Sequence, residues 1–90
     1  MKKISIEIRN AFYNNESKKM SNTKTDGKAI YLFDNKIAEK REDGLYITTA
    51  GWHTSTTKER LNTLPGVSIQ QKNYAWFLNG KAWDGNWIKI

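Results

Sequence analysis

Closely spaced turn signals are the feature of this sequence that most restricts its fold. Three of them occur within a short stretch, at Asp26-Gly27, Asp34-Asn35 and Glu42-Asp43-Gly44. Each offers residues that tolerate the positive φ angles of tight hairpin turns. The segments between them, 28–33, 36–41 and 45–49, alternate in the manner of strands. The sequence therefore predicts a β-meander of three or four strands in this region.

Two more turn signals lie near the C-terminus, at Asn79-Gly80 and Asp84-Gly85. Asn-Gly is the strongest short-range hairpin signal, and here it follows the apolar run 74–78. A two-residue turn at Asn79-Gly80 would place Trp76 opposite Trp83 as an aromatic cross-strand pair. Because two tight hairpins in succession would leave a very short middle strand, we expect one of the two turns to be a bulge.

One helix is predicted after the meander. Thr56 and Glu59 have the spacing of a capping box, and Pro65-Gly66 must end the helix. A helix of about two turns is not stable alone. We therefore expect Leu61 and Leu64, which lie three residues apart, to dock it on the sheet.

The first 21 residues have a less definite pattern. Isoleucine alternates with polar residues over 4–9, which favours a strand, although a helix that continues into 11–13 is an open alternative. Residues 14–25 are polar except for Met20. We expect a loop there, or a solvated edge strand protected by its lysines.

These segments predict a single α+β domain over residues 1–90, because 90 residues are too few for two cores. In this domain a twisted antiparallel sheet of about five to seven short strands packs against one short helix. Four Trp, four Tyr and three Phe supply the bulk of a small core. The chain has no cysteine, which excludes disulfides and thiolate metal sites and fits a reducing cytosol. No apolar run approaches the roughly 20 residues of a membrane span.

Basic residues outnumber acidic ones, and the formal net charge is +6. The excess is uneven, with seven basic and three acidic side chains in residues 1–28 and five and two in residues 57–90. The charge argues against DNA mimicry by an acidic surface and favours anionic partners. Such a partner would meet the two ends of the chain first.

No pattern typical of catalysis or metal binding is visible. His53 is the only histidine, and no nucleophile motif accompanies it, which favours a structural or surface role. One histidine, no cysteine and scattered carboxylates give no metal-ligand spacing. The aspartates before or within turns are explained as turn formers. We therefore expect no enzyme activity, no cofactor and no metal.

Candidate binding residues lie in the segment 50–62 and among the basic and aromatic side chains. A Gly-Trp turn precedes a hydroxyl-rich helix N-terminus, which could hold a phosphate or could simply be capped by Thr56. The four tryptophans could stack on unpaired bases or pack in the core. The candidate binding residues are Lys18, Lys19, Lys24, Trp52, His53, Thr57, Lys58, Arg60 and Lys72.

Several motifs in fixed order carry a resemblance to known proteins. They are residues 35–39 (Asn-Lys-Ile-Ala-Glu), Ala50-Gly51-Trp52, residues 56–62, and Trp76, Leu78-Asn79-Gly80, Trp83, Gly85 and Trp87. Together they resemble a family of small, functionally uncharacterised tailed-bacteriophage proteins, over roughly residues 22–88. The resemblance implies a phage or prophage origin and action in the cytoplasm of the bacterial host. It implies no activity and no catalytic residues.

Two functions from different classes follow. The preferred one is a non-enzymatic phage accessory protein that binds a host or anti-phage-defence macromolecule, a protein or ribonucleoprotein, and inhibits it. The alternative is a nucleic-acid-binding protein whose basic side chains contact phosphates. An enzyme is the third and least favoured possibility.

Overall fold

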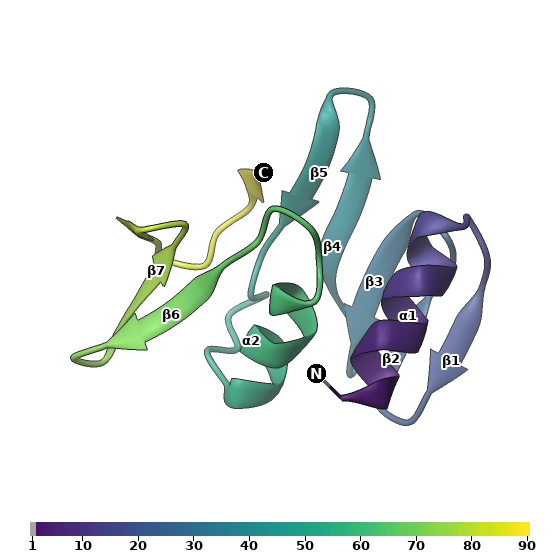
Figure 1. Ribbon diagram of the computed structural model, residues 1–90, viewed down its shortest axis with the longest axis horizontal. Coiled ribbons are helices and arrows are strands. Elements are labelled where there is room, and N and C mark those ends of the chain that lie inside the picture. The colour runs from purple at the N-terminus through teal and green to yellow at the C-terminus, as the bar shows by residue number, and fades with distance from the viewer. Residues whose placement is uncertain (1) are drawn as a thin grey trace.

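The computed structural model describes residues 2–90, which form a six-stranded and a three-stranded antiparallel sheet with two helices (Figure 1). The large sheet has the order β1-β2-β3-β4-β5-β9 and the small sheet β6-β7-β8. The predicted α+β class, with an antiparallel sheet packed against a helix, is confirmed. The large sheet comprises β1 (Lys18–Met20), β2 (Thr23–Thr25), β3 (Ala29–Leu32), β4 (Asn35–Arg41), β5 (Gly44–Ile47) and β9 (Ile88–Lys89). The small sheet comprises β6 (Ile69–Lys72), β7 (Ala75–Leu78) and β8 (Lys81–Ala82).

The predicted meander is present, with β2 to β5 paired to their neighbours in chain order. The turn between β3 and β4 differs from the prediction by one residue, because Leu32 pairs with Asn35 and the turn consists of Phe33 and Asp34. Both turn residues have positive φ, 50° and 65°. The sequence signal at Asp34 was therefore real, but the bulky Phe33 occupies the other turn position.

The N-terminal segment is a helix, α1 (Lys3–Tyr13), and the predicted strand was wrong. The alternation of isoleucines fits a strand only over a few residues, whereas the buried positions 5, 8, 11 and 12 follow the helical period. The helix packs on β1–β3 (Figure 1). Lys40 holds its C-terminal end, since its Nζ donates to the Phe12 carbonyl oxygen at 2.6 Å and to Asn15 Oδ1 at 2.8 Å. Of the two alternatives for the polar segment that follows, the structure has the edge strand, β1.

The second helix, α2 (Ser55–Asn62), begins where the sequence indicated, but its cap is different. Thr54 is the N-cap and accepts a hydrogen bond from the Thr57 backbone N–H at 3.2 Å, so the predicted Thr56–Glu59 box was two residues late. The sequence pattern favoured Thr56 because a capping box needs Glu or Gln three residues later, whereas the residue three after Thr54 is Thr57. Leu61 and Leu64 are buried as predicted.

One hydrophobic cluster joins the helices and both sheets. Its fully buried members include Phe12 of α1, Ile37 and Ala38 of β4, Ile47 of β5 and Leu61 of α2. Residues of the small sheet belong to the same cluster. The two sheets therefore share a core. Neither helix within residues 2–90 has the length and apolar character needed to cross a membrane.

The C-terminal hairpin forms at Asn79-Gly80 as predicted, and the Trp83 backbone N–H donates to the Trp76 carbonyl oxygen at 3.0 Å. The second signal is no hairpin: the Asp84 carboxylate accepts the Asn86 backbone N–H at 2.9 Å, which makes an Asx turn. This turn leads the chain back to β9, which pairs with β5. The small sheet is thereby tied to the large one.

Candidate functional site

A pocket of about 420 Å³ lies between the β3–β4 turn and the N-terminus of α2. Its volume is within the range of ligand-binding pockets. Phe33 and Trp52 line it and are 67% and 58% exposed. We call it the aromatic pocket. Its lining residues are Leu32, Phe33, Ile37, Thr49, Trp52, Thr54, Thr56 and Thr57.

Phe33 occupies an unfavourable backbone conformation. Its φ of 50° lies in the left-handed region, where a side chain with a Cβ costs roughly 1–2 kcal/mol. Two-residue turns of this kind favour Asn and Gly. The Phe33 N–H donates to the Asn22 carbonyl oxygen at 2.8 Å, so this strained turn is held against the turn between β1 and β2. The fold thus keeps a large apolar side chain in solvent at a position that suits a small polar one.

Tyr74 repeats this arrangement at the tip of the β6–β7 hairpin, which extends away from the rest of the molecule (Figure 1). The turn is formed by Asn73 and Tyr74, with φ of 51° and 67°, and Tyr74 is 98% exposed. The Asn79-Gly80 turn of the same sheet has φ of 51° and 86° and uses the preferred glycine. The tyrosine is therefore not required by the turn.

Trp52 is presented by a tight turn in which Ala50 and Gly51 have positive φ and the Trp52 N–H donates to the Thr49 carbonyl oxygen at 2.9 Å. Gly85 packs directly under this turn. A Cβ at Gly85 would overlap Thr49 Oγ1 and would lie 2.9 Å from the His53 ring. The Gly85 carbonyl oxygen also accepts the Thr49 N–H at 2.9 Å. The return segment from the small sheet thus fixes where Trp52 is held.

A wider depression of about 890 Å³ lies beside the small sheet. His53 lines it and packs edge-on against Trp76, with ring centroids 4.8 Å apart. The Lys58 ammonium lies over the same Trp76 ring, 5.9 Å from its centroid. Tyr74 also contributes to this depression. Two consecutive residues therefore line different hollows, Trp52 the aromatic pocket and His53 the depression.

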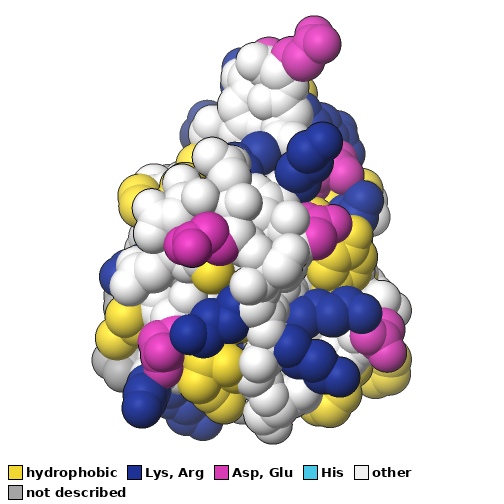
Figure 2. Space-filling model, turned by 90° about the vertical axis from the view of Figure 1, so that its right-hand side faces the viewer, with side chains coloured by type: hydrophobic (Ala, Val, Ile, Leu, Met, Phe, Trp, Pro, Cys, Tyr) yellow, Lys and Arg dark blue, Asp and Glu magenta, His cyan; other side chains and the backbone are white. Residues whose placement is uncertain are grey.

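The predicted basic residues of β1 and β2 do not form a continuous patch. Lys18 pairs with Glu7 at 3.1 Å and Lys24 pairs with Asp34 at 3.0 Å. Lys19, and Lys72 at the end of β6, are exposed. Figure 2 shows the side of the molecule that carries α1 and β1, where Lys and Arg side chains are interspersed with Asp, Glu and hydrophobic ones. Much of the positive charge is locally compensated.

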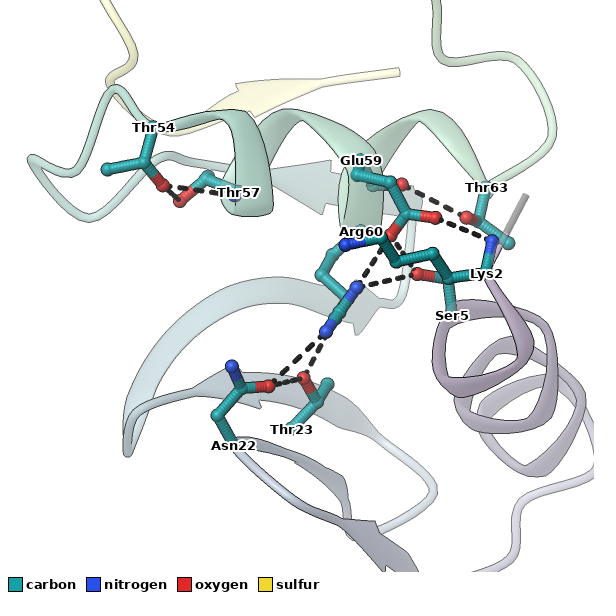
Figure 3. A network of polar contacts seen from close by, with 9 residues as sticks. All are labelled: Lys2, Ser5, Asn22, Thr23, Thr54, Thr57, Glu59, Arg60 and Thr63. Carbon is teal, nitrogen blue, oxygen red and sulfur yellow. Dashed lines mark hydrogen bonds and ion pairs between the residues drawn. The ribbon is translucent and has the colours of Figure 1, made fainter.

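Arg60 is the centre of an internal polar network and is only 7% exposed (Figure 3). Its guanidinium donates to Thr23 Oγ1 at 2.9 Å, to Ser5 Oγ at 3.1 Å and to the Glu59 carboxylate at 2.6 Å. It also reaches Asn22 Oδ1 at 3.3 Å. These contacts join α1, the β1–β2 turn and α2, so the side chain is occupied by the fold and does not present its charge to a phosphate.

Glu59 completes this network. Burial raises the pKa of its carboxyl, but hydrogen bonds from Ser5 Oγ, the Lys2 backbone N–H and Arg60 outweigh burial and hold the pKa below its usual value. The glutamate is therefore ionised and part of the fold. Thr57 is likewise internal, with its hydroxyl 3.1 Å from that of Thr54.

The sequence-based candidates Trp52 and His53 each line one of the two hollows, whereas Phe33 and Tyr74, which also line them, were not among the candidates. Phe33 directly precedes the turn signal Asp34, and Tyr74 directly follows Asn73. An aromatic residue beside an Asn or Asp between two strand segments was the available signal. The sequence contained no corresponding signal for the Arg60 network, because no spacing rule relates residues of different elements. Within residues 2–90, no group of three or more His, Asp or Glu side chains is placed to hold a metal ion.

In the comparison with known proteins, a protein-family model described as Kyanoviridae Gp96 protein matches residues 1–89. No curated protein and no solved structure matches the chain significantly.

Proposed function

This chain belongs to the Kyanoviridae Gp96 protein family, a tailed-phage family, and from this premise we propose that it is a phage accessory protein that inhibits a protein of the host or of its anti-phage defence. It acts in the cytoplasm of the infected bacterium. It carries out no enzymatic reaction and works by binding alone. The match extends the resemblance to residues 1–21, the part of the chain in which α1 and β1 lie.

The observation that carries this proposal is the pair of exposed aromatic side chains on strained turns. Phe33 and Tyr74 have positive φ although their hairpins would be more stable with Asn or Gly. Strain of this kind, where the fold does not need it, is typical of functional positions. Aromatic side chains are also the anchors that protein interfaces favour.

Nucleic-acid binding is the second candidate, and the net charge of +6 with exposed Lys19 and Lys72 favours it. Two observations weigh against it. Lys18 and Lys24 are paired with carboxylates, and the Arg60 guanidinium is enclosed. A phosphate-binding surface would need these charges to be available together.

Affinity capture from infected bacteria tests the choice, with wild-type protein and the variant Phe33→Asn run in parallel, each with and without nuclease. We expect a protein partner that survives nuclease and is lost with Phe33→Asn. Trp87→Ala is the matched control, because Trp87 is 41% exposed but lies against Arg41 of β4, away from the aromatic pocket. A partner that disappears after nuclease would contradict the proposal.

A titration against single- and double-stranded DNA and RNA at about 150 mM salt tests the second candidate directly. Non-specific binding at such salt has a Kd of about 10⁻⁴ to 10⁻⁶ M. We expect binding no tighter than this. Submicromolar affinity that falls steeply with added salt would favour a nucleic-acid-binding protein.

A further inference from the structure

We infer that the aromatic pocket takes one apolar side chain from an acidic segment of the partner polypeptide. This inference rests on the proposed function and adds the chemistry of the partner. It commits to a polypeptide whose anchor enters the pocket and whose flanking carboxylates face the basic side chains beside it.

The lining of the pocket supports an apolar anchor. Three of its four threonines already use their hydroxyls: those of Thr54 and Thr57 lie 3.1 Å apart, and Thr49 Oγ1 accepts the Gly51 N–H at 3.3 Å. The other lining side chains are those of Thr56 and of four apolar residues, Leu32, Phe33, Ile37 and Trp52, so the lining is mainly apolar. A polar group entering the pocket would lose its water without full replacement of its hydrogen bonds, which is unfavourable.

The charges beside the pocket support an acidic segment. Phe33 also lines a smaller hollow together with Lys19, Lys24 and Asp34. Asp34 is the one carboxylate that lines this hollow and is bonded to Lys24, so the two lysines leave an excess of one positive charge there. Lys58 directly follows Thr57, which lines the aromatic pocket, and its ammonium lies over Trp76. Lysine side chains are therefore found beside Phe33 and next to Thr57, and complementary charge on a partner would guide its approach.

The extent of the aromatic surface supports a polypeptide. A small molecule confined to the aromatic pocket would leave Tyr74 and the depression beyond His53 without a role. An extended chain anchored between Phe33 and Trp52 can continue across His53 toward that depression. Binding energy would be concentrated at the anchor, as in most protein interfaces.

Short synthetic peptides, titrated into the full-length protein, test the inference. The first probe has one phenylalanine flanked by aspartates and glutamates. A second has alanine in place of phenylalanine, and a third has lysines in place of the acids. NMR spectra should show saturable shifts of the Trp52 indole N–H and the Thr56 and Thr57 amides with the first probe. We expect at least about tenfold weaker binding for the other two.

A pocket-filling variant gives the matched comparison. Thr56→Leu places an apolar side chain in the pocket without touching the Thr54–Thr57 cap, whereas Ser55→Leu adds the same side chain at an exposed neighbour that does not line it. We expect Thr56→Leu to weaken binding of the first peptide about tenfold or more and Ser55→Leu to leave that affinity unchanged. If the NMR spectrum of Thr56→Leu is no longer dispersed, this variant is not folded, and Phe33→Asn takes its place in the comparison.

Three results would overturn the inference: equal binding of the alanine peptide, no difference between the two leucine variants, or free indole binding as tightly as the peptide. Shifts at Trp52 produced by single-stranded DNA and not by the acidic peptide would also overturn it. The proposed function has its own test, because capture of a nuclease-resistant partner does not depend on these peptides. Failure here together with successful capture would mean that the partner uses another surface.

Discussion

Two aromatic residues hold conformations that other residues would adopt more easily. In Phe33 and Tyr74 the strain is local to one turn position, so a single substitution should relieve it. Replacement would remove the exposed ring at the same time. Stability and binding are therefore expected to change in opposite directions at these two positions, as is common at functional sites.

Tyr74→Gly should make the β6–β7 turn resemble Asn79-Gly80. We expect a gain of about 1 kcal/mol in the free energy of unfolding, because glycine adopts the positive φ without a Cβ clash. Urea denaturation followed by circular dichroism measures it. The reverse change at the second turn, Gly80→Ala, should lose a similar amount, since nothing lies within 4 Å of the added Cβ and only the φ of 86° opposes it. A loss of stability in Tyr74→Gly would show that the ring has a packing role.

Gly85 and Gly51 have similar φ, 92° and 86°, but different surroundings. Alanine at Gly51 meets no atom within 4 Å, whereas at Gly85 it meets Thr49 and His53. Both variants should be destabilised by backbone strain, and Gly85→Ala by about 1–3 kcal/mol more because of the overlap. Urea denaturation gives both values, and Trp fluorescence reports whether the Trp52 turn has moved. Equal destabilisation would mean that the contact under the turn is easily relieved.

The Glu59 carboxylate should contribute to acid sensitivity. Its pKa in the folded protein is below the ordinary value of 4.5, so its contribution to stability is complete above about pH 4.5 and is lost as the pH falls through the lower, folded pKa. Glu59→Gln removes the titrating group. We expect this variant to be less stable at neutral pH and to lose stability less steeply on acidification. Thermal melts from pH 7 to pH 2 measure this, and unchanged steepness would assign the acid response to other carboxylates.

At the scale of elements, the sequence predicted segments with a distinct local signal and failed where two periods overlap. The meander and the Asn79-Gly80 hairpin follow from turn chemistry that requires particular residues. The pattern at residues 4–9 fits both a strand and a helix, and contacts of Ile8 and Phe12 with the core decide for α1. Tertiary packing, which no local pattern contains, made that choice.

The short helix α2 depends on its docking. Leu61 is fully buried against the shared core, and Leu61→Ala should cost about 2–5 kcal/mol through lost burial and a cavity. Lys58→Ala, on the same helix, should cost little because Lys58 remains partly exposed. Urea denaturation of the two variants provides the comparison. If Leu61→Ala unfolds like the wild type, the helix contributes less to the core than its burial indicates.

At the scale of the molecule, two sheets with separate hydrogen bonding share one hydrophobic cluster. We expect the two sheets to unfold together, because loss of either sheet would expose the buried apolar face of the other to water. Three of the tryptophans lie within residues 76–87, so Trp fluorescence mainly reports on the region of the small sheet. Far-ultraviolet circular dichroism reports on all secondary structure. The urea transitions measured by the two signals should coincide. Two separated midpoints would mean that the small sheet opens on its own.

The candidate surface could be predicted only in part because it combines distant segments. Trp52, His53 and Lys58 lie close in sequence, and their association was expected. Phe33 comes from another hairpin, and its proximity to Trp52 depends on how α2 packs against β4. Arg60 was expected to be a binding residue together with Lys58, yet its partners Ser5 and Thr23 lie 55 and 37 residues away. Contacts at such separations are determined by the assembled fold.

The strained turns also predict which positions should vary among related phage proteins. In a phage lineage whose hosts lack the partner, mutations at Phe33 and Tyr74 to Asn or Gly would be favoured by folding alone and opposed by nothing. These codons should then be among the first to drift, while Gly85 and Arg60, on which the fold depends, should stay constant. Retention of aromatic residues at both turns in a set of relatives would therefore record continued contact with the partner, and their joint loss would mark lineages in which that contact has ended.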